Sequence, residues 1–299
     1  MRPRWWLVFI PIVLGLIAAL VIFLTDVPKP VIYAQADLWI LVFGIGISLS
    51  ILVALIIAVL DQIEKTQIDA TIQFAEDRRR FLQRLDHELK NPLTAILAGL
   101  ANLSIAETSN DRSISLTSVQ TQVGRLRQLV SELRKLSELE TRPLDLGPIE
   151  MTELLEDSYA LAEDHPEIGE RVLSISIPRA PWPLPSINGD RDLLILAIHN
   201  LLDNAIKFSR SGDTIEMRAF EDGNQVVIEV ADTGPGIPEE DVVQVWDELY
   251  RGAGARGIRG SGLGLALVRA IVSRHEGSID LRSRSGEGTV FMLRLPVGN

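Results

Sequence analysis

A single histidine, His87, is placed on the polar face of a predicted helix. Residues 86–93 read Asp-His-Glu-Leu-Lys-Asn-Pro-Leu, and apolar residues recur around them every three or four positions, which predicts one buried helix face. The apolar positions are Leu82, Leu85, Leu89, Leu93, Ile96, Leu100 and Leu103. His87 lies about 160° from the centre of that face at roughly 100° per residue, so we expect its imidazole to face solvent. An imidazole can act as a nucleophile near neutral pH, although an ordinary surface histidine would give the same pattern.

A second group of polar residues has the types and spacing that nucleotide binding requires. Asn200 and Asn204 lie four residues apart, hence on one helix face, and Lys207 follows about one turn later. An amide oxygen can ligate Mg²⁺, whereas an amide N–H and an ammonium group can donate to phosphate. Asp232 follows a predicted strand, where its carboxylate could accept a hydrogen bond from an adenine amino group. Taken singly, each feature would also fit a solvated helix face or a turn.

Glycine-rich turns could bring the backbone close to the same ligand. Gly234 and Gly236 lie in the turn Asp-Thr-Gly-Pro-Gly, where the missing side chains permit close approach. A second segment, Gly-Ser-Gly-Leu-Gly, contains Gly260, Gly262 and Gly264. It leads into a predicted helix, whose N-terminus presents N–H groups to phosphate. The intervening segment 238–259 is rich in Gly and Arg near its end, which fits a lid over a ligand and equally a disordered loop.

Two long amphipathic helices must position His87. Residues 61–104 predict one helix, and a polar turn at 107–113 leads to a second stripe that runs from Val119 to Leu136. Two such helices form a hairpin, which we expect over residues 61–140. Because one hairpin buries only one face of each helix, pairing of two copies into a four-helix bundle would complete the core. We therefore expect a homodimer.

A different pattern follows the predicted linker at 141–148, which contains two prolines and a glycine. Residues 149–299 alternate helix and strand periodicities and predict an α+β domain. Helices are expected at 152–163, 191–208 and 264–275, and strands at 172–177, 214–220, 225–231, 278–284 and 289–295. This domain carries all of the candidate nucleotide-binding residues.

The first 60 residues predict a membrane anchor. Two uncharged stretches, at about 5–24 and 38–60, are each long enough to cross a bilayer as a helix. The basic residues Arg2 and Arg4 precede the first stretch, which predicts that the N-terminus and the part after residue 60 are cytoplasmic. The loop 25–37 would then face outward from the inner (cytoplasmic) membrane. It is too short for a ligand-binding domain, so any signal that the chain receives is expected from the membrane itself or, by preference, from a partner protein in it.

The composition excludes several classes of function. There are 40 acidic and 29 basic residues, giving a net charge of -11, so binding of nucleic acid is not expected. The chain has no cysteine, which excludes disulfides, thiolate catalysis and cysteine-bound zinc. None of its four histidines is paired at a metal-ligand spacing such as His-Glu-x-x-His.

The order of the C-terminal motifs resembles the four nucleotide-binding boxes of sensor histidine kinases. These motifs are Asn-Leu-Leu-Asp-Asn-Ala-Ile-Lys at 200–207, Asp-Thr-Gly-Pro-Gly-Ile at 232–237, Gly-Ser-Gly-Leu-Gly at 260–264 and Gly-Glu-Gly-Thr at 286–289. They also resemble the wider ATPase superfamily that includes gyrase, Hsp90 and MutL. The segment His-Glu-Leu-Lys-Asn-Pro-Leu at 87–93 resembles the phosphoacceptor box of histidine kinases, which those other ATPases lack. The resemblance covers roughly residues 82–295.

The resemblance implies an α+β sandwich of the Bergerat, or GHKL, type that binds ATP with Mg²⁺. It implies that Asn200 helps to hold the metal, that Asn204 and Lys207 contact phosphates and that Asp232 reads the adenine. The turn glycines, Gly234 and Gly236, would shape the base pocket, and Gly260, Gly262 and Gly264 would cradle phosphate.

The resemblance also implies a phosphoryl relay on the hairpin. His87 would attack the γ-phosphate, with Glu88 as the base, and the phosphoryl group would pass to an aspartate in the receiver domain of a response regulator. Asn91, on the same helix face as His87, would orient a water that dephosphorylates the regulator.

Three other functions stay open at this point. A catalytically silent adaptor would bind ATP and a partner without transferring phosphate. Intact His87, Glu88, Asn200 and Asp232 argue against it. A conformational ATPase of the gyrase or Hsp90 type would need neither the acceptor helix nor a membrane anchor. A phosphatase-dominant histidine kinase would use the same residues.

Overall fold

The computed structural model describes residues 9–24, 38–105, 108–179, 181–255 and 257–298. The chain divides into two compact units, Met1–Arg80 and Phe81–Asn299, and each is described by itself.

The N-terminal unit contains α1 (Phe9–Leu24) and the first part of α2 (Leu38–Ile105). One helix in the described ranges, Ile40–Ile105, carries a stretch long and apolar enough to cross a membrane. The apolar segment of α1, Phe9–Ala18, falls short of the roughly 20 residues that a span requires, so the expected pair of spans is not confirmed. The expected outer loop, 25–37, and the start of the first expected span lie outside the described residues.

Glycines let α1 and α2 approach closely within this unit. A Cβ atom added at Gly15 would stand 3.3 Å from the Cα of Gly46, and one added at Gly46 would stand 3.1 Å from the carbonyl oxygen of Pro11. Ser50, one turn after Gly46, is also buried. Small residues spaced by four therefore pack these apolar helices against each other.

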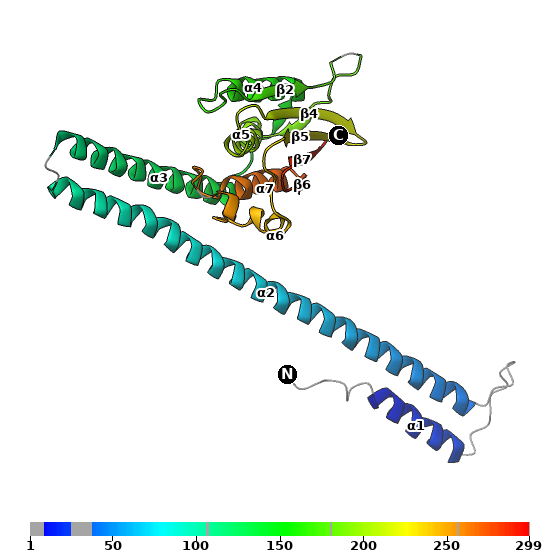
Figure 1. The fold of residues 1–299 in the computed structure, drawn as a ribbon. Coiled ribbons are helices and arrows are strands. Elements are labelled where there is room, and N and C mark those ends of the chain that lie inside the picture. The colour runs from blue at the N-terminus through cyan, green and yellow to red at the C-terminus, as the bar shows by residue number, and fades with distance from the viewer. Residues whose placement is uncertain (1–8, 25–37, 106–107, 180, 256, 299) are drawn as a thin grey trace. The chain divides into compact units, whose positions relative to one another are not determined.

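The second unit begins with a helical hairpin, in which α3 (Ser109–Thr141) runs back along the C-terminal part of α2 (Figure 1). Near the turn the helices touch at Gly99, where an added Cβ would stand 2.6 Å from a methyl group of Val119. The expected long turn is wrong in its second half, since α3 already begins at Ser109. Thr108 caps this helix by accepting the backbone N–H of Asp111 and donating its hydroxyl to the Asp111 carboxylate.

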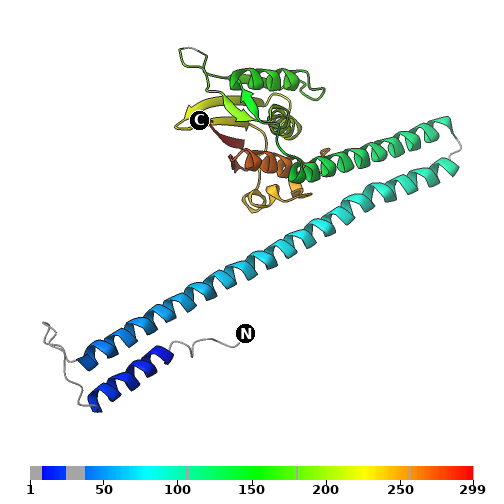
Figure 2. The same ribbon diagram turned by 180° about the vertical axis from the view of Figure 1, so that it is seen from behind.

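A five-stranded sheet forms the base of the C-terminal domain, in the order β2-β4-β5-β7-β6 (Figures 1 and 2). The strands are β2 (Val172–Ser176), β4 (Thr214–Asp222), β5 (Gln225–Asp232), β6 (Ser278–Arg284) and β7 (Gly288–Pro296). β2 pairs parallel with β4, and all other neighbours are antiparallel. This order brings the ends of β5 and β7 together, with Asp232 opposite Thr289.

Three helices cover one face of the sheet: α4 (Met151–Glu163), α5 (Arg191–Phe208) and α7 (Gly264–Arg274). Along β4, Ile215 and Met217 are fully buried beneath them, whereas Glu216 and Arg218 alternate onto the other face and pair with each other. Such alternation is the pattern of an antiparallel sheet with one covered face. The α+β sandwich expected from the sequence is therefore present.

Most elements of this domain match their predicted ranges, and α5 begins where Asp190 accepts the N–H of Leu193 as a cap. Two short strands were not predicted. β1 (Gly147–Ile149) pairs antiparallel with β3 (Ile187–Gly189), so the end of the expected linker belongs to a strand. Three residues are too few to show a period of two, and only their pairing defines them.

Candidate functional site

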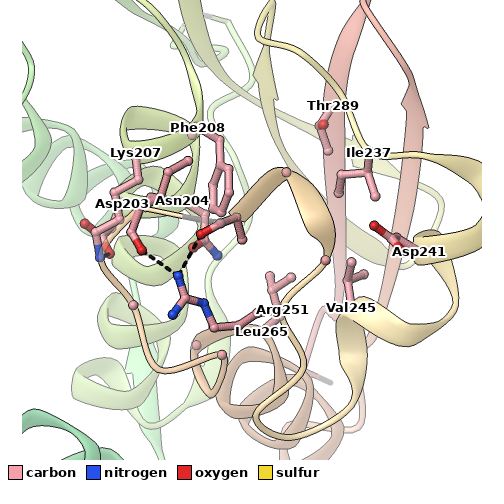
Figure 3. Close-up of a pocket in the computed structure, with 18 of the residues that line it drawn as sticks. Asp203, Asn204, Lys207, Phe208, Ile237, Asp241, Val245, Arg251, Leu265 and Thr289 are labelled. Carbon is pink, nitrogen blue, oxygen red and sulfur yellow. Dashed lines mark hydrogen bonds and ion pairs between the residues drawn. The ribbon is translucent and has the colours of Figure 1, made fainter. Parts of the chain in front are cut away.

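A cavity of 660 Å³ opens beside α5 and the start of α7 (Figure 3). Most of the predicted nucleotide-binding residues line it: Asn200, Asn204, Lys207, Asp232, Gly236, Gly260, Gly262 and Gly264. Gly234 does not line the cavity but lies buried behind it, where an added Cβ would stand 2.9 Å from Asp232 Oδ1. The fold thus collects motifs from residue 200 to residue 289 into one site.

Asn200 presents its amide oxygen to this cavity. Its Nδ2 donates to the carbonyl of Leu196 at 2.7 Å, so the helix itself sets the orientation of the amide. The oxygen lies against the start of α7, where a Cβ on Gly264 would stand 3.0 Å from it. An amide oxygen is a suitable ligand for Mg²⁺, which takes few protein ligands and keeps water and substrate phosphate. The residues present therefore fit that ion.

Lys207 is held at the cavity wall by a carboxylate. Its Nζ lies 2.5 Å from Oδ2 of Asp203, one turn earlier on α5, and the two side chains are only 17% and 19% exposed. Both line the cavity. An ammonium group has three donors, so this ion pair leaves two of them for a phosphate.

Asp232 lies at the end of β5 in an environment that disfavours its charge. Burial raises the pKa of its carboxyl group to about 6, against the opposing effect of the backbone N–H groups of Gly234 and Thr289. Oδ1 accepts the N–H of Gly234 at 2.9 Å. A partly buried carboxylate held in this way has acceptor capacity left for a donor in the cavity.

The turns that contain Gly236 and Gly288 pack tightly against each other next to Asp232. Gly236 has φ +67, and a Cβ there would stand 2.0 Å from the carbonyl oxygen of Arg284. Gly288 has φ +116, and its added Cβ would stand 2.0 Å from the carbonyl oxygen of Asp232. The Gly-Glu-Gly-Thr turn thus supports the base of the cavity, and its Thr289 lines the cavity directly. Thr289 was not among the predicted site residues, although the motif itself was noted.

The segment 238–259, expected as a lid or a disordered loop, forms α6 (Glu239–Val242) and two short 3₁₀ turns, η2 (Gln244–Trp246) and η3 (Ala253–Ala255). Its base is closed by a hydrogen bond from the N–H of Leu249 to the carbonyl of Gly262 at 3.0 Å. Nη2 of Arg251 donates to the carbonyls of Ala255 and Ile258, the contacts dashed in Figure 3. The described part of this segment is therefore folded over one side of the cavity.

His87 lies exposed on α2, which confirms the predicted orientation. Glu88 beside it is half-buried, and Asn91, one turn later, is exposed. Arg84, one turn before His87, donates to Asp247 Oδ2 and to the carbonyl of Glu248, each at 3.1 Å. Its guanidinium also lies 5.3 Å from the centre of the Tyr250 ring. The helix turn that carries His87 therefore contacts the segment that covers the cavity.

The hairpin also contributes to the cavity wall. Gln128 and Glu132 of α3 line it, and the Glu132 carboxylate accepts the hydroxyl of Ser261. Leu129 of α3 packs with Leu249 and Leu263 in a small apolar cluster. Sequence reasoning missed these residues because no local motif marks them.

Two families of known proteins match the chain. Residues 77–142 match the His Kinase A (phospho-acceptor) domain, and residues 189–299 match the family of histidine kinase-, DNA gyrase B- and HSP90-like ATPases. The fold and the site therefore define a class of protein in which a phosphoacceptor hairpin precedes an ATPase domain.

Individual relatives agree with this class. Sensor histidine kinase YclK of Bacillus subtilis is 30% identical over 241 residues, which cover 78% of this chain and 50% of YclK. The structure of full-length ShkA in complex with AMPPNP is 27% identical, with a TM-score of 0.51 over 72% of this chain and 45% of ShkA. The histidine kinase ThkA, solved with the response regulator protein TrrA, shares the fold, with a TM-score of 0.60, 22% identity and coverage of 73% of this chain and 61% of ThkA.

This chain belongs to the sensor histidine kinase family of two-component systems. It spans about half the length of YclK.

Proposed function

We propose that the protein is an ATP-dependent protein-histidine kinase that autophosphorylates His87 and passes the phosphoryl group to an aspartate of a response regulator. One observation carries this proposal. The same chain has an exposed imidazole on an acceptor hairpin and a 660 Å³ cavity that gathers the residues expected to bind a nucleotide. Neither a silent adaptor nor a conformational ATPase requires both.

In this proposal each group has a defined task. Asp232 accepts the adenine amino group, Asn204 and Lys207 donate to phosphate oxygens, and the glycine-rich start of α7 adds backbone N–H groups. An imidazole nitrogen of His87 attacks the γ-phosphorus, the bond from that phosphorus to the bridging oxygen breaks, and ADP leaves. Glu88 accepts the proton that the imidazole loses.

The Asn200 oxygen is suited to hold Mg²⁺ together with the phosphates. When bound, this ion would neutralise charge that develops on the transferred phosphoryl group. The hydrogen bond from the Asn200 amide to the carbonyl of Leu196 orients the amide for this role.

The receiver domain of a response regulator is the proposed acceptor of the phosphoryl group. The match of residues 77–142 to a phospho-acceptor domain supports this step, as does the exposure of His87 on its helix. Asn91 lies one turn further along α2 and is also exposed, so its amide could orient a water at the phosphorylated regulator. We therefore include phosphatase activity in the proposed function.

We further propose that two copies pair through the hairpin. The predicted apolar face of α2 is only partly covered, since its residues Leu82, Leu93 and Leu100 remain 49–53% exposed. The neighbouring Leu97, outside that face, is 68% exposed. On α3, Ile114, Leu116, Val123 and Val130 are 42–60% exposed. Two such faces are complementary in a four-helix bundle.

The proposed location is the bacterial inner membrane, with α1 and the start of α2 as a two-helix anchor. The close packing of α1 on α2 at Gly15 and Gly46 supports a helical pair in the membrane. The termini would face the cytoplasm, and a membrane partner would supply the signal.

The full chain in detergent, incubated with Mg²⁺ and γ-labelled ATP beside its His87→Gln variant, tests the proposal. Acid-labile and base-stable label on the wild type alone is expected for phosphohistidine at this position. ATP binding by both proteins with label on neither would contradict the proposed kinase and favour an adaptor. Label on both would contradict the assignment of His87.

A further inference from the structure

A histidine, a carboxylate and an ammonium group form a continuous chain at the wall of the nucleotide cavity. His165 Nε2 lies 3.3 Å from Asp203 Oδ1, and the other oxygen of Asp203 lies 2.5 Å from Lys207 Nζ. Asp203 and Lys207 line the cavity, as Figure 3 shows, whereas His165 contacts Asp203 from the loop after α4. All three side chains are less than one-fifth exposed.

The loop around His165 determines which ring nitrogen carries the proton. Nδ1 accepts the backbone N–H of Glu167 at 3.1 Å, so in the neutral ring the proton is on Nε2. This N–H faces Asp203. The main chain of His165 is held as well, because its N–H donates to Ala162 and its carbonyl accepts from Ile168. The ring therefore has a fixed direction that does not depend on a bound ligand.

When Asp203 is held in place, the entropic cost for Lys207 to bind phosphate is lower. A lysine side chain loses conformational freedom when it is ordered, and this loss costs free energy. If Asp203 has already ordered it at the cavity wall, less of that cost is incurred when the nucleotide arrives. Asp203 can do so only while its own carboxylate is held, and His165 occupies the oxygen that Lys207 does not.

We propose that His165 is a positioning residue of the nucleotide site: it orients Asp203, which in turn holds Lys207 where its ammonium group meets the phosphates of ATP. The inference rests on the proposed function, since it takes the cavity to be the ATP site. His165 itself touches neither the substrate nor the metal.

Binding of ATP and adenosine to the full chain in detergent tests this role, together with KM for ATP and kcat of autophosphorylation. His165→Ala is expected to weaken ATP binding and raise KM roughly fivefold, the factor that corresponds to one ordinary hydrogen bond. The value of kcat and the affinity for adenosine, which lacks phosphate, should stay within about twofold, the range of small mutational effects away from a contact. His165→Gln keeps an N–H donor and should restore most of the ATP affinity.

The matched control is Glu167→Ala in the same loop. The Glu167 side chain is exposed, and the substitution leaves its backbone N–H to His165 in place, so ATP affinity should equal that of the wild type. In an Asp203→Ala background, His165→Ala should cause no further loss, because its partner is gone.

Three results would overturn the inference while the proposed function stands. The first is a wild-type protein that binds ATP no better than His165→Ala does, and the second is an equal loss of ATP and adenosine affinity in that variant. The third is additive losses of ATP affinity in the double variant. A wild-type protein that binds no ATP would instead contradict the proposed function itself.

Discussion

Asp232 shows how the fold changes the chemistry of one residue. Its carboxyl group has a pKa of about 6 because burial disfavours the charged form. The ionised group is the better acceptor for an adenine amino group, so ATP affinity should fall as the pH drops through 6. At pH 5 about one carboxyl group in eleven is ionised, and the apparent affinity should be about tenfold weaker than at pH 8.

Calorimetric titration with ATP between pH 5 and pH 8 measures this dependence. Asp232→Asn is the control, since it should bind ATP weakly with only the pH dependence of the nucleotide's own phosphates. If both proteins give the same pH profile, Asp232 does not bind the base.

Substitution of Asn91 tests the proposed phosphatase activity. The side chain is exposed on the His87 face of α2, so its removal should disturb neither folding nor ATP binding. We expect Asn91→Ala to keep autophosphorylation and to dephosphorylate a phosphorylated response regulator roughly tenfold more slowly or worse, because a positioned water is lost. The measurement is the decay of labelled regulator with each protein and ADP, and equal rates would refute the role.

At the scale of elements, the paired turns under Asp232 are the most constrained part of the site. Gly236 has φ +67 and no room for a Cβ, whereas Gly212 has φ +86 with nothing within 4 Å of an added Cβ. Alanine substitutions at the two positions therefore separate the effect of backbone strain on stability from the effect of a steric clash.

We expect Gly212→Ala to lower the free energy of unfolding by about 1 kcal/mol, the cost of a left-handed residue. Gly236→Ala should lose about 1–3 kcal/mol more through overpacking, and ATP affinity with it. Chemical denaturation of both variants gives the comparison. Equal losses would mean that the turn against Arg284 can open without cost.

The elements themselves were largely readable from the sequence. The range of α5 is predicted to the residue because its apolar residues recur at helical spacing after a capping residue, for which Asp190 and Asn188 are both candidates. The structure shows that the cap is Asp190. The turn between the hairpin helices is predicted to end too late, because Asn110 and Asp111 also suit a turn. The capping contact of Thr108 with Asp111 decides in favour of a helix start. β1 and β3 have no local signal and exist only through their pairing.

At the scale of the whole molecule, the exposed leucines of the hairpin predict association. Leu97 is 68% exposed on α2, so a charge there should leave the single chain folded while it disrupts an apolar dimer face. We expect Leu97→Glu to be monomeric by analytical ultracentrifugation and to bind ATP normally. Leu161→Glu, at a leucine 51% exposed on the C-terminal domain, is the matched control and should remain dimeric. A dimeric Leu97→Glu protein would place the interface elsewhere.

The sequence by itself determined the residue types, the order of the motifs and most of the elements, because helix and strand periods, caps and glycine turns are local properties of the chain. It also predicted that His87 faces solvent. Only the tertiary structure decided that Gln128 and Glu132 line the cavity, that Thr289 lies opposite Asp232 and that His165 meets Asp203. These contacts join residues from separate elements, and they depend on how the sheet and helices pack, which no local pattern records.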